Sequence, residues 1–167
     1  MTAAGLAAAL LGCSPALDWR EVRPEESGAL AMFPCKPQRF TRRVPLACAQ
    51  VEMRLASCTV QDATYAIGYA TLGDPRQVTP ALGELSRAAA GNIGASPTPT
   101  AWSIAGMTPN PLAQRLVMSG HDAEGKPVQE QAVFFVRGLR VYQATVVGPA
   151  LDAAAAETFF SGLKLLS

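Results

Sequence analysis

The single histidine of the chain, His121, is the first candidate for chemistry, because imidazole serves as a metal ligand and as a general base. Asp122 and Glu124 follow closely and could complete a metal clip. The spacing argues against a metal site or a marked nucleophile, since the chain has no His-x-x-x-His pair, no Asp-x-Asp-x-Asp calcium pattern and no Gly-x-Ser-x-Gly elbow. Glycine, aspartate and proline in this segment indicate a solvent-exposed turn. A Ser-His-Asp triad stays open, because its members meet in space rather than in sequence.

Two adjacent carboxylates, Glu25 and Glu26, could act as a catalytic pair in glycosidic chemistry. Neighbouring residues of a polar segment point apart, so we expect both side chains to be solvated. The stretch Gly91-Asn92-Ile93-Gly94 matches neither a phosphate-binding loop nor a dinucleotide fingerprint. We therefore expect no catalytic residue, no cofactor and no metal, and a protein that is not an enzyme.

Composition narrows the class of partner. The 167 residues include 14 Lys plus Arg and 13 Asp plus Glu, which gives a formal net charge of +1. The chain therefore lacks the excess of basic residues that is typical of a nucleic-acid-binding protein, and we expect no nucleic-acid partner. Hydrophobic residues make up 49% of the chain, enough for one folded domain with a real core.

The N-terminus indicates export. Residues 1–12 are apolar and rich in alanine, too short to span a bilayer, and Cys13 follows at once. Because this segment has no Lys or Arg and is short, we interpret it as the remnant of a signal peptide. Leu10-Leu11-Gly12-Cys13 resembles the lipobox of bacterial lipoproteins, which implies that Cys13 is freed by cleavage and acylated. The alternative is a frayed alanine-rich helix with an incidental cysteine.

That resemblance implies a periplasmic protein that is lipid-anchored through Cys13. It also implies the outer membrane, because Ser14, the residue directly after the cysteine, resembles that position in lipoproteins delivered there. The membrane is then contacted through the lipid anchor only. Residues 13–27 are polar and punctuated by proline, which is typical of a tether. Trp19 is expected to pack on the edge of the domain.

Residues 28–167 are predicted to form a single α+β domain, a mostly antiparallel sheet with two main helices. Helical spacing of apolar residues runs from Leu82 to Ile93, with Thr79-Pro80 at the start and Gly94 past the end, and a second helix is predicted over 152–161. Gly138-Leu139 predicts a two-residue hairpin turn. Alternating apolar and polar residues predict strands over 28–33, 40–46, 51–60, 64–72, 102–107, 112–119, 128–137 and 140–147, and Leu163 to Leu165 could add a short extended segment.

The cysteines allow one internal disulfide. If Cys13 is acylated, Cys35, Cys48 and Cys58 remain. A hairpin that turns near Cys48 brings Cys58 opposite about residue 40, close to Cys35, and leaves Cys48 at the far end. We predict a Cys35–Cys58 bond and a free Cys48. A metal site made of these cysteines is not expected, because no pair has CxxC spacing.

With its strands laid out, the chain resembles a group of small, uncharacterised proteobacterial envelope lipoproteins and, more distantly, the PsbP-type αβα sandwich. The resemblance is structural and implies a non-enzymatic accessory or binding role. The segments that carry it are Gly28–Pro37, Tyr65–Tyr69, Phe134–Tyr142, Val147-Gly148 and Glu157–Leu163.

Three functions therefore compete. The first is an envelope accessory lipoprotein that binds a protein partner, an unknown envelope protein. The second is a small-ligand carrier with an apolar pocket between helix and sheet. The third is an unrecognised hydrolase, which needs His121 within hydrogen-bond reach of a serine or cysteine.

Overall fold

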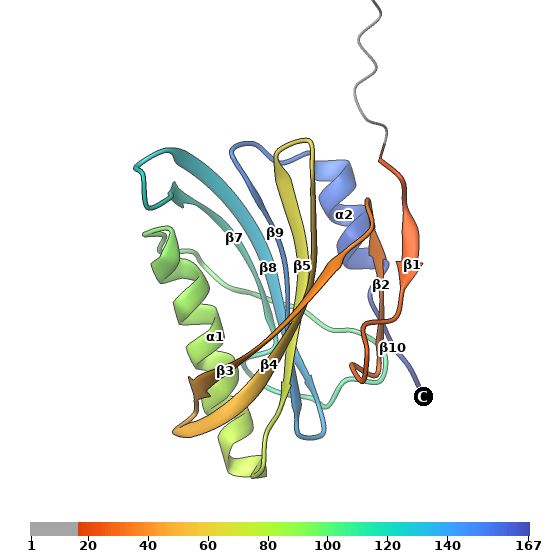
Figure 1. The fold of residues 1–167 in the computed structure, drawn as a ribbon. Coiled ribbons are helices and arrows are strands. Elements are labelled where there is room, and N and C mark those ends of the chain that lie inside the picture. The colour runs from red at the N-terminus through yellow and green to blue at the C-terminus, as the bar shows by residue number, and fades with distance from the viewer. Residues whose placement is uncertain (1–16) are drawn as a thin grey trace, which may run out of the picture.

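A seven-stranded antiparallel sheet in the order β3-β4-β5-β9-β8-β7-β6 organises the fold (Figure 1). A second, three-stranded sheet has the order β1-β2-β10. The computed structural model describes residues 17–167 and confirms the α+β class with a mostly antiparallel sheet and two α-helices. The elements are β1 (Arg20–Val22), β2 (Ala29–Phe33), β3 (Gln38–Leu46), β4 (Ala49–Val60), β5 (Ala63–Thr71), the 3-10 helix η1 (Pro75–Gln77), α1 (Val78–Asn92), β6 (Thr100–Ala101), β7 (Gln114–His121), β8 (Pro127–Arg137), β9 (Arg140–Gly148), α2 (Ala153–Ser161) and β10 (Lys164–Leu165).

The alternation of side chains divides the core between the two faces of the large sheet. On β5, Tyr65 and Ile67 face α2 and the small sheet, whereas Ala70 faces α1. Figure 1 shows α1 on one side of the sheet and α2 with β1, β2 and β10 on the other. The α2 side is aromatic: Phe159 of α2 meets the rings of Phe33 and Tyr65 edge to face, with centroids 5.5 Å apart in each pair.

The helix α1 buries one stripe of its surface against β8 and β9. Its buried residues include Val78, Ala81, Leu82 and Ala89, the spacing that places side chains on one helical face. The helix begins at Val78, ahead of the predicted start at Thr79-Pro80, because η1 leads directly into it. Asp74 caps η1 by accepting a hydrogen bond of 2.8 Å from the Arg76 amide.

Two segments differ from the sequence prediction. Residues 102–107, expected to be a strand, form an irregular loop in which the Met107 amide donates to the Ile104 carbonyl and Gly106 has a positive φ of 82°. The residues expected to be a tether contain β1, which pairs with β2 in the register Arg20↔Phe33, and Ser27 is fully buried. Trp19 packs against Tyr65 at the edge of the α2 side, as predicted.

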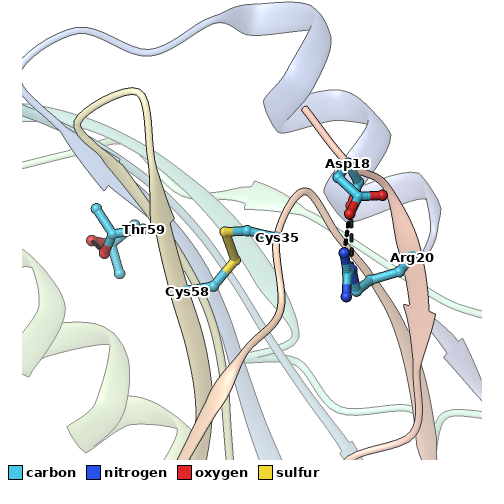
Figure 2. The surroundings of a disulfide bond; sticks show 6 residues. Asp18, Arg20, Cys35, Cys58 and Thr59 are labelled. Atoms are coloured by element: carbon cyan, nitrogen blue, oxygen red, sulfur yellow. Dashed lines mark hydrogen bonds and ion pairs between the residues drawn. A yellow bond between two sulfur atoms is a disulfide. The ribbon is translucent and has the colours of Figure 1, made fainter. Parts of the chain in front are cut away.

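A disulfide joins Cys35, just after β2, to Cys58 on β4, with 6.0 Å between the Cα atoms (Figure 2). The predicted pairing is thus confirmed, and it closes a loop across both sheets that should stabilise the fold by about 3 kcal/mol. Cys48 is free and exposed, also as predicted. Cys13 lies outside the described residues. Within residues 17–167, no helix has both the length and the apolar character needed to cross a bilayer.

Candidate functional site

A largely apolar hollow of the described surface lies between α1 and the β3–β4–β5 end of the large sheet. We call it the α1 groove; its volume is about 540 Å³. It is lined by Phe40, Arg42, Val44, Pro45, Leu46, Met53, Leu55, Ala66, Gly68, Glu84, Leu85, Ala88, Asn92, Gln143 and Thr145. Strand β3 forms one wall, α1 forms the other, and the middle strands of the sheet form the floor.

The groove exists because α1 covers only part of its face of the sheet. The helix packs over β8 and β9, so the side chains that β3 and β4 direct to the same face have no helix above them. Phe40 is 49% exposed as a result, and Met53 and Leu55 are only half-buried. Small residues on the floor leave the space above it empty. At Gly68, for example, an added Cβ would lie 3.5 Å from Leu55 Cδ1.

The turn between β3 and β4 closes one end of the groove against α1. The Ala47 amide donates a 2.9 Å hydrogen bond to Glu84 Oε2, and Gln77 Nε2 donates to the Ala47 carbonyl at 3.3 Å. Ala47 and Cys48 have positive φ angles of 49° and 62°, which matches the two-residue turn that twists in the same sense as its strands. We call these two bonds the hairpin latch.

The polar groups of the groove are few. Gln143 Nε2 donates to Thr145 Oγ1 at 3.2 Å on the floor, and Glu84 holds the latch. Arg42 is exposed on the β3 wall, and its side chain makes no hydrogen bond or ion pair within the described part of the chain. An apolar trough with a few fixed polar groups is the usual make-up of a small-molecule site, whose volume is typically about 300–1,000 Å³.

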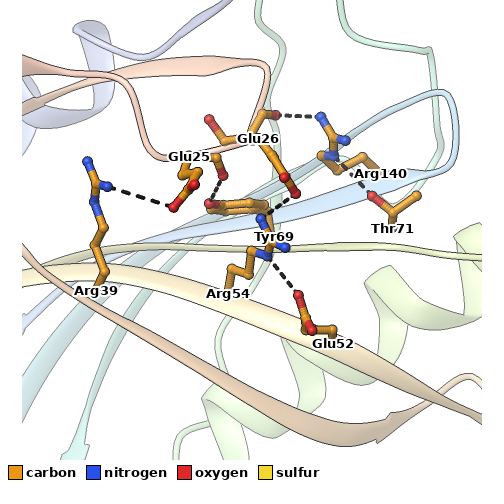
Figure 3. Close-up of polar contacts among 9 residues, drawn as sticks. Glu25, Glu26, Arg39, Glu52, Arg54, Tyr69, Thr71 and Arg140 are labelled. Carbon is orange, nitrogen blue, oxygen red and sulfur yellow. Dashed lines mark hydrogen bonds and ion pairs between the residues drawn. The ribbon is translucent and has the colours of Figure 1, made fainter.

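A second group of polar residues lies on the opposite face of the sheet beside the segment that leads into β2 (Figure 3). Arg54 pairs with Glu26 and donates from Nε to Glu52 at 2.8 Å. The bond to Glu52 is the main cause that raises the pKa of the Arg54 guanidinium. Tyr69 donates its hydroxyl hydrogen to the Glu25 carbonyl, and burial raises the pKa of this phenol, which keeps it a donor.

This polar cluster fastens the segment before β2 to the sheet. Tyr142 Oη and Arg140 Nη1 both donate to the Ser27 carbonyl, at 2.6 and 2.9 Å. The carboxylates of Glu25 and Glu26 pair with different arginines, Glu25 with Arg39 at 3.9 Å. The two acids therefore point apart, as the sequence indicated, and their bonds give the cluster a structural role.

His121 lies at the end of β7 and is exposed. Its amide donates to the Ile93 carbonyl at 2.9 Å, and Asp122 Oδ1 accepts from the amides of Glu124 and Lys126, the pattern of a tight turn. In the described chain, His121 has no hydrogen bond to a serine or cysteine, and no cluster of three His, Cys, Asp or Glu side chains is placed to hold a metal ion.

Glu130 is an acid that the sequence analysis did not single out. It lies on β8, on the α1 face of the sheet, opposite Met118 of β7 and Val147 of β9, and is 6% exposed. Removal from water raises its pKa from an ordinary 4.5 to about 7. Glu130 does not line the α1 groove.

Comparisons with protein-family models and with curated proteins find no match to this chain. The function is therefore argued from the groove and its lining. Sequence reasoning raised an apolar pocket between helix and sheet only as an alternative and named none of its residues, although the small residues Ala66 and Gly68 in the middle of a strand were a signal of it, since they leave space above the sheet.

Proposed function

We propose that this protein is a non-catalytic carrier of a small apolar ligand, which it binds in the α1 groove. The observation that carries the proposal is the 540 Å³ hollow between helix and sheet, lined largely by side chains such as Phe40, Leu55 and Leu85. Burying these apolar surfaces under a ligand gains roughly 25 cal/mol per Å² removed from water.

A protein partner, the first function expected from the sequence, is less well supported. A stable protein interface buries roughly 800 Å² on each partner and has a well-packed apolar centre. Within residues 17–167, the large apolar side chains that are strongly exposed are Phe40, Val117 and Leu139. They lie on β3, on β7 and in the β8–β9 turn, so they form no common patch. The concave groove suits a small molecule better.

Export and lipid anchoring remain part of the proposal. The lipobox-like Leu10–Cys13 supports acylation, and a disulfide between Cys35 and Cys58 is suited to an oxidising compartment such as the periplasm. An outer-membrane carrier that handles apolar molecules would work where such molecules must cross water between two membranes.

The proposal is tested by filling the groove. Ala88 is an exposed residue of α1 that lines it, so Ala88→Trp places an indole in the hollow without disturbing the buried face of the helix. We expect the full chain to bind the neutral probe N-phenylnaphthylamine with a rise in fluorescence, and Ala88→Trp to weaken this binding about tenfold or more.

The matched control is Ala154→Trp, an exposed alanine on α2, at the opposite face of the sheet. This variant should bind the probe as the unchanged protein does. Equal binding by the Ala88→Trp variant, with the fold intact by circular dichroism, would refute the groove as the site.

A further inference from the structure

Arg42 is placed as a cation at the rim of an apolar trough. On β3, residues alternate between the two faces of the sheet, so Phe40, Arg42 and Val44 share the groove side. Arg42 lies opposite Met53, another lining residue. Its neighbours on this face are thus apolar side chains, and a ligand that covers them would remove water from around a charge interaction made there and strengthen it.

No acid of the groove neutralises this charge. The one carboxylate among the lining residues is Glu84, and its Oε2 accepts the Ala47 amide in the hairpin latch. Two arginines on the other face of the same hairpin are paired, Arg39 with Glu25 and Arg54 with Glu26 and Glu52. The side chain of Arg42, like that of Arg43 on the other face, has no ion pair or hydrogen bond in the described chain, but Arg42 is the one arginine that lines the α1 groove.

We infer that the ligand is a single-chain amphiphile with a carboxylate head, of the fatty-acid class, whose chain lies in the α1 groove and whose head pairs with Arg42. This inference rests on the proposed function and adds the chemical class of the ligand. A guanidinium presents two parallel N–H donors that match the two oxygens of a carboxylate. One arginine also matches one negative charge, whereas a phosphate monoester carries about two.

The test compares three ligands that share a ten-carbon chain: decanoate, decanol and decyltrimethylammonium. Each competes with N-phenylnaphthylamine for the full chain at low salt. We expect decanoate to bind about tenfold more tightly than decanol, the usual size of a charge-assisted bond, and decyltrimethylammonium to bind most weakly. Longer carboxylates should bind about fourfold more tightly for each added CH₂ until the groove is full.

The variant Arg42→Gln separates the contribution of the ligand's carboxylate head from that of its hydrocarbon chain. It should bind decanoate and decanol equally, with decanol and probe binding close to those of the unchanged protein. Arg43→Gln, a neighbouring exposed arginine on the other face of β3, should leave the preference for decanoate intact.

The outcomes are distinguishable. If Ala88→Trp does not weaken probe binding, the groove is not the site and the proposed function fails with the inference. If Ala88→Trp abolishes probe binding but Arg42→Gln keeps the preference for decanoate, the function stands and the carboxylate assignment is wrong. Binding to phosphatidylglycerol vesicles through Arg42 without any binding of free decanoate would instead assign Arg42 to a membrane surface and would also overturn the inference.

Discussion

Glu130 carries a carboxyl group that the fold largely removes from water without giving it a cation. Its neighbours across the strands are Met118 and Val147, and its carboxyl group makes no hydrogen bond or ion pair in the described chain. Desolvation disfavours the charged form, which is why the pKa is raised to about 7. The group therefore changes its charge near neutral pH.

We expect Glu130 to make stability fall as the pH rises. Because the pKa is higher in the folded chain than in the unfolded one, the folded state binds the proton more tightly. This contribution is fully present below about pH 4.5 and is lost as the pH rises through 7. Its size is at most about 3 kcal/mol, from about 1.4 kcal/mol per pKa unit.

The free energy of unfolding of the Glu130→Gln variant, measured by urea denaturation, should therefore equal that of the unchanged protein at pH 4 and exceed it at pH 8. Glu124→Gln, an exposed glutamate in the turn after β7, is the control and should follow the unchanged protein at both values. A parallel pH dependence in the Glu130→Gln variant would show that the carboxyl group is not desolvated in solution.

At the scale of elements, the β3–β4 hairpin determines the shape of the groove. Its strands diverge from α1, and its tip returns to the helix through the hairpin latch (Figure 1). Ala47 is 6% exposed, so its amide has little access to water when Glu84 is removed. An unsatisfied buried donor costs roughly 1–3 kcal/mol.

Glu84→Ala should consequently loosen the hairpin tip. We expect the free energy of unfolding to fall by about 1–2 kcal/mol and the Ala47 amide to exchange with solvent faster, while amides of β8 and β9 are unchanged. Glu21→Ala serves as control, because Glu21 is an exposed residue of β1 whose side chain has no partner among residues 17–167. Slow exchange of the Ala47 amide in the variant would mean that the bond to Glu84 is not what holds the tip.

Local patterns predicted most elements. Apolar and polar residues alternate in β4 from Val51 to Leu55, whereas β8 and β9 contain apolar stretches that are buried on both faces of the sheet. The β8–β9 turn followed from Gly138, which has a positive φ of 58°, and α2 followed from Asp152, whose Oδ1 accepts from the Ala155 amide at 2.8 Å. The predicted register of the β3–β4 hairpin, with Cys58 opposite about residue 40, was wrong by a few residues. Phe40 lies opposite Leu55, and Cys58 lies just beyond the pair Gln38↔Ser57. The tight two-residue turn accounts for the shift.

The groove could not be predicted in the same way. Alternation identifies which side chains of β3 face the interior, but the position of α1 across the sheet decides whether anything covers them. That position is set by the packing of Leu82 and Ala89 on Phe134 and its neighbours, contacts between distant parts of the chain. Similarly, β1 is too short to show an alternation of apolar and polar residues, and it forms because it pairs with β2.

At the scale of the whole molecule, the two faces of the large sheet have different roles. Leu17, the first described residue, packs against the core on the α2 side, together with Trp19. The groove lies on the α1 side. Figure 1 shows the chain entering β1 beside α2, at the far side of the sheet from α1. An anchor near residue 13 would therefore attach to the face opposite the groove.

This arrangement predicts the orientation of the anchored protein. Three residues lie between Cys13 and Leu17, so the two Cα atoms are at most about 14 Å apart, and a lipid on Cys13 would hold the α2 side against the bilayer and leave the groove towards water. Cys48, exposed at the groove end of the hairpin, reports on this directly. On intact vesicles that carry the acylated protein, a polyethylene-glycol maleimide should modify Cys48 as fast as it modifies the soluble Cys13→Ser variant. A Cys48→Ser variant gives the background rate. Protection of Cys48 in the anchored protein alone would place the groove against the membrane, and the carrier would then draw its ligand from the bilayer rather than from solution.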